Sequence, residues 1–189
     1  SYVEPLIGSK FWDMPTLMWW SQRDVFALTL IYLGLGLSCL VTLGMANGVI
    51  MAILWLLQLS FMTIGQTFWS FGWESNLLEL GFLAIFLCPF WKRAYFCSSY
   101  PPAKILIWFY RWTLFRLMLG SGLIKLRGDP CWLDLSCLMV HYETQPIPNP
   151  LSPFFHFLPE SFHKLSVMVN HVMELVLPWF IFAPYRLLR

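Results

Sequence analysis

Charged residues are scarce in this chain of 189 residues. Asp, Glu, Lys and Arg make up 12% of it, about half of the roughly 25% found in an average soluble domain. A soluble globular protein of this size would lack the charge needed to cover its surface. Hydrophobic residues reach 58% and aromatic residues 19%. This composition predicts an all-α fold, a polytopic transmembrane helical bundle.

Features typical of several other protein classes are also missing. No basic tract is present, so we expect no nucleic-acid partner. The residues before the first apolar run include Glu4, Asp13 and Asp24, which is unlike a signal peptide. The first apolar run therefore acts as an uncleaved anchor, or the chain is a fragment of a longer protein. The absence of an initiator Met favours the fragment.

Apolar segments long enough for membrane helices recur along the whole chain. A helix needs about 20 mainly apolar residues to cross roughly 30 Å of hydrocarbon. We expect one transmembrane domain over residues 1–189 with about five spans, at residues 25–45, 49–71, 77–90, 105–123 and 162–182. The third segment is short, so it is tilted, interfacial or begins earlier.

Four charged residues fall within these predicted spans. Arg111 and Arg116 lie in the fourth span, Glu79 in the third and Glu174 in the fifth. Charges at such depth are costly unless they face protein, water or an opposite charge. The sequence therefore predicts an intramembrane charge network of these four residues.

The positive residues between the spans predict the orientation of the chain. Three of them lie in residues 91–104, and Arg186 and Arg189 lie near its end. Five spans place these two regions on the same side of the membrane, which the positive-inside rule makes cytosolic. Residues 120–163 then form a loop on the non-cytosolic side.

This loop combines prolines with polar side chains. Four prolines between residues 146 and 153 favour an extended, polyproline-like path without helix. Five consecutive side chains that can form hydrogen bonds come directly before it, at residues 141–145. We expect a recognition surface here, with these candidate client-binding residues: His141, Tyr142, Glu143, Thr144, Gln145, Pro146, Pro148 and Asn149.

Signals for a chemical centre are weak. His171 and Glu174 have helical i, i+3 spacing, but no second pair completes a bundle metal site, so we expect no metal and no cofactor. Cys131 and Cys137 bracket a short segment and would form a disulfide on an oxidising side of the membrane. Their five-residue gap differs from the two-residue gap of the usual dithiol redox motif, which argues against a redox helper.

Several sequence motifs resemble the lipase maturation factor family. They are GSGLIKLRGDPCW (residues 120–132) and HYETQPIPNP (141–150), with PTLMWW (15–20), GQTFWSFGWESNLLELGFLAIFLCP (65–89) and LFRLMLGSGLIKL (114–126) upstream. Ten consecutive residues as unusual as HYETQPIPNP are a specific signal. The resemblance covers nearly the whole chain, and the family consists of polytopic proteins of the endoplasmic reticulum membrane.

The resemblance implies a role in the folding, assembly and export of secreted lipases of the lipoprotein lipase group. It implies these lipases and membrane lipid as partners, and no established chemical reaction, so we expect no enzyme. The family is also similar to the membrane domain of vitamin K-dependent carboxylases. This keeps an alternative open, a membrane-embedded enzyme that uses Lys125, His141 and Glu143.

Overall fold

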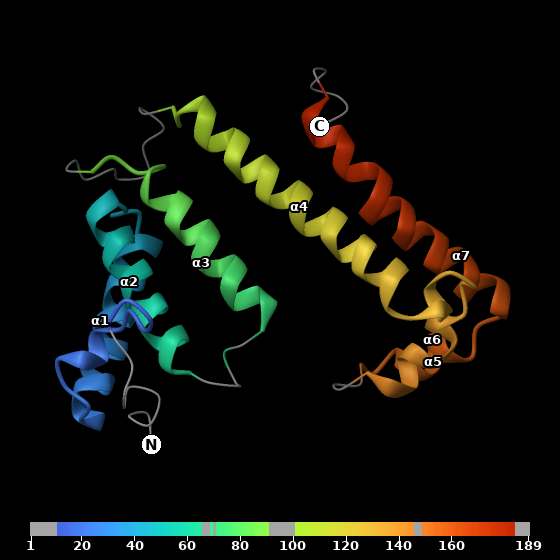
Figure 1. The fold of residues 1–189 in the computed structure, drawn as a ribbon, viewed down its shortest axis with the longest axis horizontal. Coiled ribbons are helices and arrows are strands. Elements are labelled where there is room, and N and C mark those ends of the chain that lie inside the picture. The colour runs from blue at the N-terminus through green and yellow to red at the C-terminus, as the bar shows by residue number, and fades with distance from the viewer. Residues whose placement is uncertain (1–10, 66–68, 70, 91–100, 146–148, 184–189) are drawn as a thin grey trace. The chain divides into compact units, whose positions relative to one another are not determined.

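The computed structural model describes residues 11–65, 69, 71–90, 101–145 and 149–183 (Figure 1). Its regular elements are helical, which confirms the all-α class for this part of the chain. The chain divides into two compact units, Ser1–Tyr110 and Arg111–Arg189. The elements are η2 (Leu17–Trp19), α1 (Asp24–Thr42), α2 (Gly48–Ile64), α3 (Gly72–Ile85), α4 (Lys104–Gly128), η4 (Pro130–Trp132), α5 (Cys137–Thr144), α6 (Ser152–His156), α7 (Glu160–His171), the π-helical η5 (Val172–Val176) and η6 (Leu177–Phe182).

The first unit packs α2 against both α1 and α3. Helix α2 starts at Asn47, whose side chain accepts a hydrogen bond from the Ile50 amide at 2.9 Å and so caps the helix. Trp55 on α2 donates its indole N–H to the Leu78 carbonyl of α3 at 2.8 Å. A cavity of about 270 Å³ lies between the three helices, with Ser38 and Gln58 among otherwise mainly apolar lining residues.

The apolar surfaces of the long helices indicate a lipid environment. Helix α1 and the continuous helix Glu160–Phe182 are each long and apolar enough to cross a membrane, and α2 is a shorter apolar helix. Large apolar side chains of α1 are exposed, including Val25 at 73% and Tyr32 at 68%. Water tolerates few contiguous apolar surfaces of this extent, whereas acyl chains cover them without cost.

The helix bounds differ from the expected spans at several places. Helix α4 continues beyond the expected residues 105–123 to Gly128, α3 covers Gly72–Ile85 rather than 77–90, and α2 ends at Ile64. The connection between α4 and α7 is therefore residues 129–159, shorter than the expected loop of residues 120–163.

The expectation that the proline-rich stretch contains no helix was wrong at its end. Pro153 lies in the first turn of α6. Proline is tolerated there because the first N–H groups of a helix have no partner within the helix. Pro146 and Pro148, as well as Arg186 and Arg189, lie outside the described residues.

A pair of buried hydroxyl groups joins the segment before α1 to α2. The Thr16 hydroxyl donates to the Ser60 carbonyl at 3.2 Å, and the Ser60 hydroxyl accepts from the Leu17 amide at 3.1 Å. Thr16 is 3% exposed and Ser60 2%.

Replacing Ser60 with alanine should destabilise the first unit. The Leu17 amide would lose its acceptor, and an unsatisfied buried donor costs about 1–3 kcal/mol. Thr29→Val is the matched control, because the exposed Thr29 hydroxyl bonds only within α1, to the Val25 carbonyl. Thermal unfolding in detergent measures both variants; equal melting temperatures would contradict the assignment.

Candidate functional site

In the second unit, α4 and α7 with its extension run antiparallel and in contact. Phe115 of α4 is 7% exposed, and its ring centroid lies 4.9 Å from that of Trp179 and 5.1 Å from that of Phe182. Further along, a Cβ atom added at Gly122 would lie 2.6 Å from Leu175 Cδ2. The absence of a side chain at Gly122 therefore permits the close approach of the two helices.

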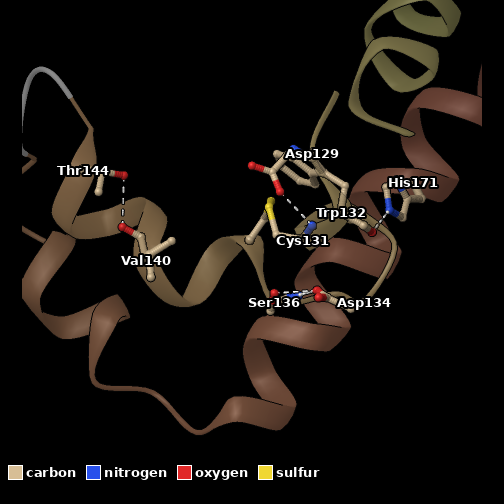
Figure 2. The surroundings of a disulfide bond; sticks show 9 residues. Asp129, Cys131, Trp132, Asp134, Ser136, Val140, Thr144 and His171 are labelled. Atoms are coloured by element: carbon tan, nitrogen blue, oxygen red, sulfur yellow. Dashed lines mark hydrogen bonds between the residues drawn. A yellow bond between two sulfur atoms is a disulfide. The ribbon is translucent and has the colours of Figure 1, made fainter. Parts of the chain in front are cut away.

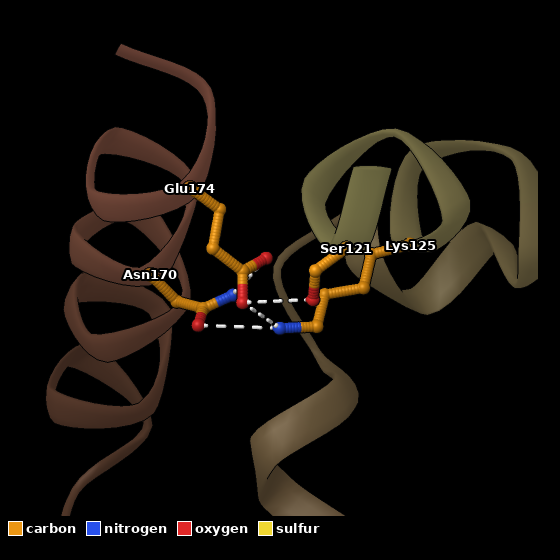
Figure 3. A network of polar contacts seen from close by, with 4 residues as sticks. All are labelled: Ser121, Lys125, Asn170 and Glu174. Carbon is orange, nitrogen blue, oxygen red and sulfur yellow. Dashed lines mark hydrogen bonds and ion pairs between the residues drawn. The ribbon is translucent and has the colours of Figure 1, made fainter. Parts of the chain in front are cut away.

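A polar network lies directly beside this close approach (Figure 3). Lys125 Nζ lies 2.5 Å from Glu174 Oε1, and the Ser121 hydroxyl donates to the same oxygen at 3.3 Å. Asn170 donates to Glu174 Oε2 at 3.4 Å and accepts from Lys125 at 3.3 Å. Both carboxylate oxygens of Glu174 therefore have partners, as a buried charge requires.

Helical spacing on each side aligns these four residues. Ser121 and Lys125 are four residues apart on α4, and Asn170 and Glu174 are four apart on the facing helix, so each pair shares one face. Glu174 lies in the π-helical segment Val172–Val176. Single π turns often occur at functional positions in helices.

The network differs in membership from the expected one. The cation in contact with Glu174 is Lys125, which belongs to the alternative catalytic set of the sequence analysis. The sequence instead predicts Arg111 or Arg116 as the partner of Glu174. Arg111, Arg116 and Glu79 each have an interaction partner. The larger network of Glu79, Arg111, Arg116 and Glu174 remains a prediction.

Contacts of Lys125 continue from this network into the loop after α4. Lys125 Nζ lies 5.0 Å from the centroid of the Trp132 ring, within the range of a cation–π interaction. His171 Nε2 donates to the Trp132 carbonyl at 2.9 Å, since a carbonyl oxygen only accepts. Trp132 therefore joins the loop to both helices at once.

The loop after α4 is closed by a disulfide between Cys131 and Cys137 (Figure 2). Their Cα atoms are 4.8 Å apart, within the usual range for a disulfide. Asp129 accepts a hydrogen bond from the Cys131 amide at 2.9 Å. Leu135, inside the closed loop, has a φ of 64°, which non-glycine residues rarely adopt.

Asp134 stabilises the turn within this loop. Its carboxylate accepts hydrogen bonds from the Ser136 hydroxyl at 2.5 Å and the Ser136 amide at 3.0 Å. These bonds, the hydroxyl first, lower the pKa of Asp134 below its ordinary value of 3.8. A lowered carboxyl pKa stabilises the fold above the unfolded-state value, and this contribution is lost as the pH falls through the folded-state value.

The polar segment at residues 141–145 forms the last turn of α5 and the residue after it. Two of its side chains point into the unit. The Tyr142 ring stacks on Phe155 at 5.9 Å between centroids and lies equally far from the ring of His163, which is 3% exposed. Gln145 donates to the Ser152 hydroxyl. These two residues hold α5 against α6 and α7.

The other three side chains of this segment are exposed: His141, Glu143 and Thr144. Glu143 accepts from His156 Nε2 at 2.9 Å, and the Thr144 hydroxyl donates to the Val140 carbonyl at 3.1 Å. The sequence did not separate the inward from the outward residues, because that division depends on the path of α6.

Asn149 lies shortly before α6 and bonds to its first residue, Ser152. The Asn149 amide donates to the Ser152 hydroxyl at 3.1 Å, and its side chain accepts from the Leu151 amide at 2.9 Å. Asn149 is therefore a structural residue as well as a candidate for binding. Pro146 and Pro148, also expected in the binding surface, lie outside the described residues.

The alternative catalytic set is divided between two clusters. Lys125 contacts Glu174, whereas Glu143 pairs with His156 on α6. No contact among these described residues joins Lys125 to His141 or Glu143. Asp129, Cys131 and Cys137 do place potential metal ligand atoms within 4.8 Å of one another, but the disulfide uses both sulfur atoms.

Comparison with known protein families matches the sequence of this chain to a family model. The family model described as "Lipase maturation factor transmembrane domain" matches residues 2–189. The chain belongs to the lipase maturation factor family. This confirms the resemblance carried by the motifs at residues 120–132 and 141–150, which include Lys125, Cys131 and the last turn of α5.

Relatives of this lipase maturation factor chain extend well beyond it. Lipase maturation factor 1 of Bos taurus is 48% identical over 188 residues, which are 95% of this chain and 34% of the relative. That of Homo sapiens is 48% identical over 177 residues, 92% of this chain and 31% of the relative. Lipase maturation factor 2 of Xenopus tropicalis is 37% identical over 198 residues, 96% of this chain and 28% of the relative.

The chain thus spans about a third of the length of the curated relatives it matches. No solved structure matches it. The names of the family and of these relatives denote maturation factors rather than enzymes, in agreement with the expectation that this is not an enzyme.

Removing the cation of the polar network should destabilise this maturation factor chain strongly. Lys125→Met leaves Glu174 buried without its counter-charge, which costs about 3–5 kcal/mol. Adding Glu174→Gln should recover much of this loss, because the uncompensated charge is then gone. Unfolding in detergent measures the free energies. A double variant no more stable than Lys125→Met would contradict the pairing.

The control for that experiment is Lys164→Met. Lys164 pairs with Glu160 at 2.6 Å, but both side chains are largely exposed. An exposed i, i+4 pair contributes little to stability, because water and salt screen the two charges. The control should therefore be nearly neutral.

Filling the space at Gly122 should separate α4 from its partner helix. Gly122→Val adds atoms where Leu175 and Glu174 Cβ already lie, at 2.6 and 3.1 Å from a built Cβ. Gly120→Val is the matched control, since a Cβ atom there would meet nothing within 4 Å. Gly122→Val should lower the melting temperature and Gly120→Val should not. Equal shifts would exclude close packing at Gly122.

Proposed function

We propose that the chain is the membrane part of an endoplasmic reticulum factor. It assists the folding, assembly and export of secreted lipases of the lipoprotein lipase group. The loop region of residues 129–159 faces the lumen and contacts the folding lipase, and about five spans hold it in the membrane. Support comes from family membership, from the names of the relatives and from the construction of the loop.

The observation that carries this proposal is the ordering of the loop before any client binds. A disulfide closes its first turn, the Tyr142 ring stacks on Phe155, and Gln145 bonds to Ser152. His141, Glu143 and Thr144 are thereby presented on a fixed helical turn. A surface that is already ordered loses less conformational entropy on binding and so binds more tightly.

The disulfide also supports the lumenal side. Disulfides persist in the oxidising lumen of the endoplasmic reticulum and are rare on the cytosolic side. This support is independent of the positive-inside rule, and both arguments favour the same side for the loop. The free cysteines among the described residues, Cys39 and Cys88, lie in or beside the apolar helices α1 and α3.

Changing the outward residues should lower lipase maturation without unfolding the chain. His141→Ala combined with Thr144→Ala removes exposed groups that no other helix requires. In cells that lack the endogenous factor, the full-length double variant should yield less secreted active lipase at unchanged lipase synthesis. Lys164→Ala, on the exposed first turn of α7, is the control. Normal secretion of active lipase by the double variant would contradict the client surface.

Glycosylation tests the side of the membrane. The sequence contains no natural Asn-X-Ser/Thr acceptor, but Asp134→Asn creates one with Ser136, and Cys97→Asn creates one with Ser99. We expect a glycosidase-sensitive mobility shift for Asp134→Asn and none for Cys97→Asn. The reverse pattern would place the loop in the cytosol, where a secreted lipase never meets it.

A further inference from the structure

Helix α6 has two faces of different character. Its inner face packs within the unit: Ser152 is buried, Phe155 stacks on Tyr142 and His156 pairs with Glu143. Three exposed apolar residues at i, i+3 spacing, one in the helix and one directly before and after it, form what we call the α6 ridge. The exposed fractions are 59% for Leu151, 65% for Phe154 and 82% for Phe157.

The α6 ridge is unusual for a surface in contact with water. Removing such side chains from water is favourable, so exposing three of them to water together is unfavourable. No Asp, Glu, Lys or Arg occurs from residue 145 to residue 159. The ridge therefore suits an uncharged apolar environment.

The α6 ridge lies close to the start of α7, which indicates that this apolar environment is the bilayer. Phe157 precedes Glu160 by three residues, and Glu160 begins the helix Glu160–Phe182, which is long and apolar enough to cross a membrane. Three residues span at most about 11 Å. The headgroup region on each side of the hydrocarbon is roughly 5–8 Å thick. Phe157 therefore lies close to the bilayer.

Ring contacts place α6 at the level of the first turn of α7. Phe155 stacks on Phe162 with 6.2 Å between centroids. The same turn carries the exposed ion pair of Glu160 and Lys164, which suits headgroup depth. From Leu165 onward the exposed side chains of this helix are chiefly apolar. Helix α6 thus lies beside the part of α7 that crosses the headgroup region.

We propose that the α6 ridge inserts into the bilayer interface beside α7 and that its partner is the phospholipid surface. Phenylalanine and leucine on one face of an interfacial helix bind at the boundary between headgroups and acyl chains. This contact holds one side of the loop region against the bilayer, so that α5 with His141 faces the lumen. The inference goes beyond the proposed function, because it does not depend on the client.

Photo-crosslinking in the full-length protein tests this contact. Benzoyl-phenylalanine replaces Phe154 or Phe157 in microsomes whose phosphatidylcholine carries a radiolabel. Phe155, on the inner face, and His141, on the exposed turn of α5, are the control positions. We expect several-fold more labelled lipid on protein substituted at 154 or 157 than at either control. Equal labelling at all four positions, no lipid adduct, or adducts to a secreted lipase would overturn the proposal.

A second measurement does not depend on the crosslinker. Phe157→Cys and His141→Cys are exposed to a membrane-impermeant maleimide in permeabilised microsomes, in a background with the free cysteines replaced by alanine. We expect labelling of Phe157→Cys to be several-fold slower than that of His141→Cys. Equal rates would place the ridge in water and overturn the proposal. Neither test measures lipase secretion by the unaltered protein. A negative result in either test would therefore not contradict the proposed function.

Discussion

The second unit depends on one ion pair in an apolar setting, Lys125 with Glu174. Separating either ion from water costs several kcal/mol, and only close contact and further hydrogen bonds offset this loss. Ser121 and Asn170 supply those bonds. Helices with alternative registers would leave Glu174 against acyl chains or apolar side chains. The pair therefore selects one register for α4 against its partner, which the exposed apolar faces of these helices would not distinguish.

This register is transmitted to the loop through Trp132. Its ring lies over Lys125 and its carbonyl accepts from His171, so it contacts both helices. The adjacent disulfide then limits how far residues 131–137 can move. The position of the loop is consequently fixed by α4 and α7, although its own interior contains little apolar core. Tyr142 and His163 extend the same order to α5 through ring contacts.

The sequence predicted the helical class, the family and the cysteine pair more successfully than it predicted contacts. Long apolar runs predict helices directly, because a helix satisfies its backbone hydrogen bonds internally, as lipid requires. Glu174 bonds to Lys125, which lies 49 residues away, and no local sequence pattern shows which cation faces a carboxylate; pairing of Glu174 with Arg111 or Arg116 remains a prediction. The inward orientation of Tyr142 was missed for the same reason. Pro153 was read as a helix breaker, although its place in a first turn makes it compatible with a helix.

The arrangement explains how a loop of about thirty residues could serve as a binding surface without a core of its own. The exposed side chains at and beside α6 are chiefly apolar, whereas α5 exposes His141, Glu143 and Thr144. If the α6 ridge lies in the bilayer interface as proposed, lipid on one side and water on the other would limit the orientation of this region. Under the proposed function, a client protein would then meet a fixed set of polar groups. Binding there would require little further ordering, which is the chief entropic loss for a flexible loop.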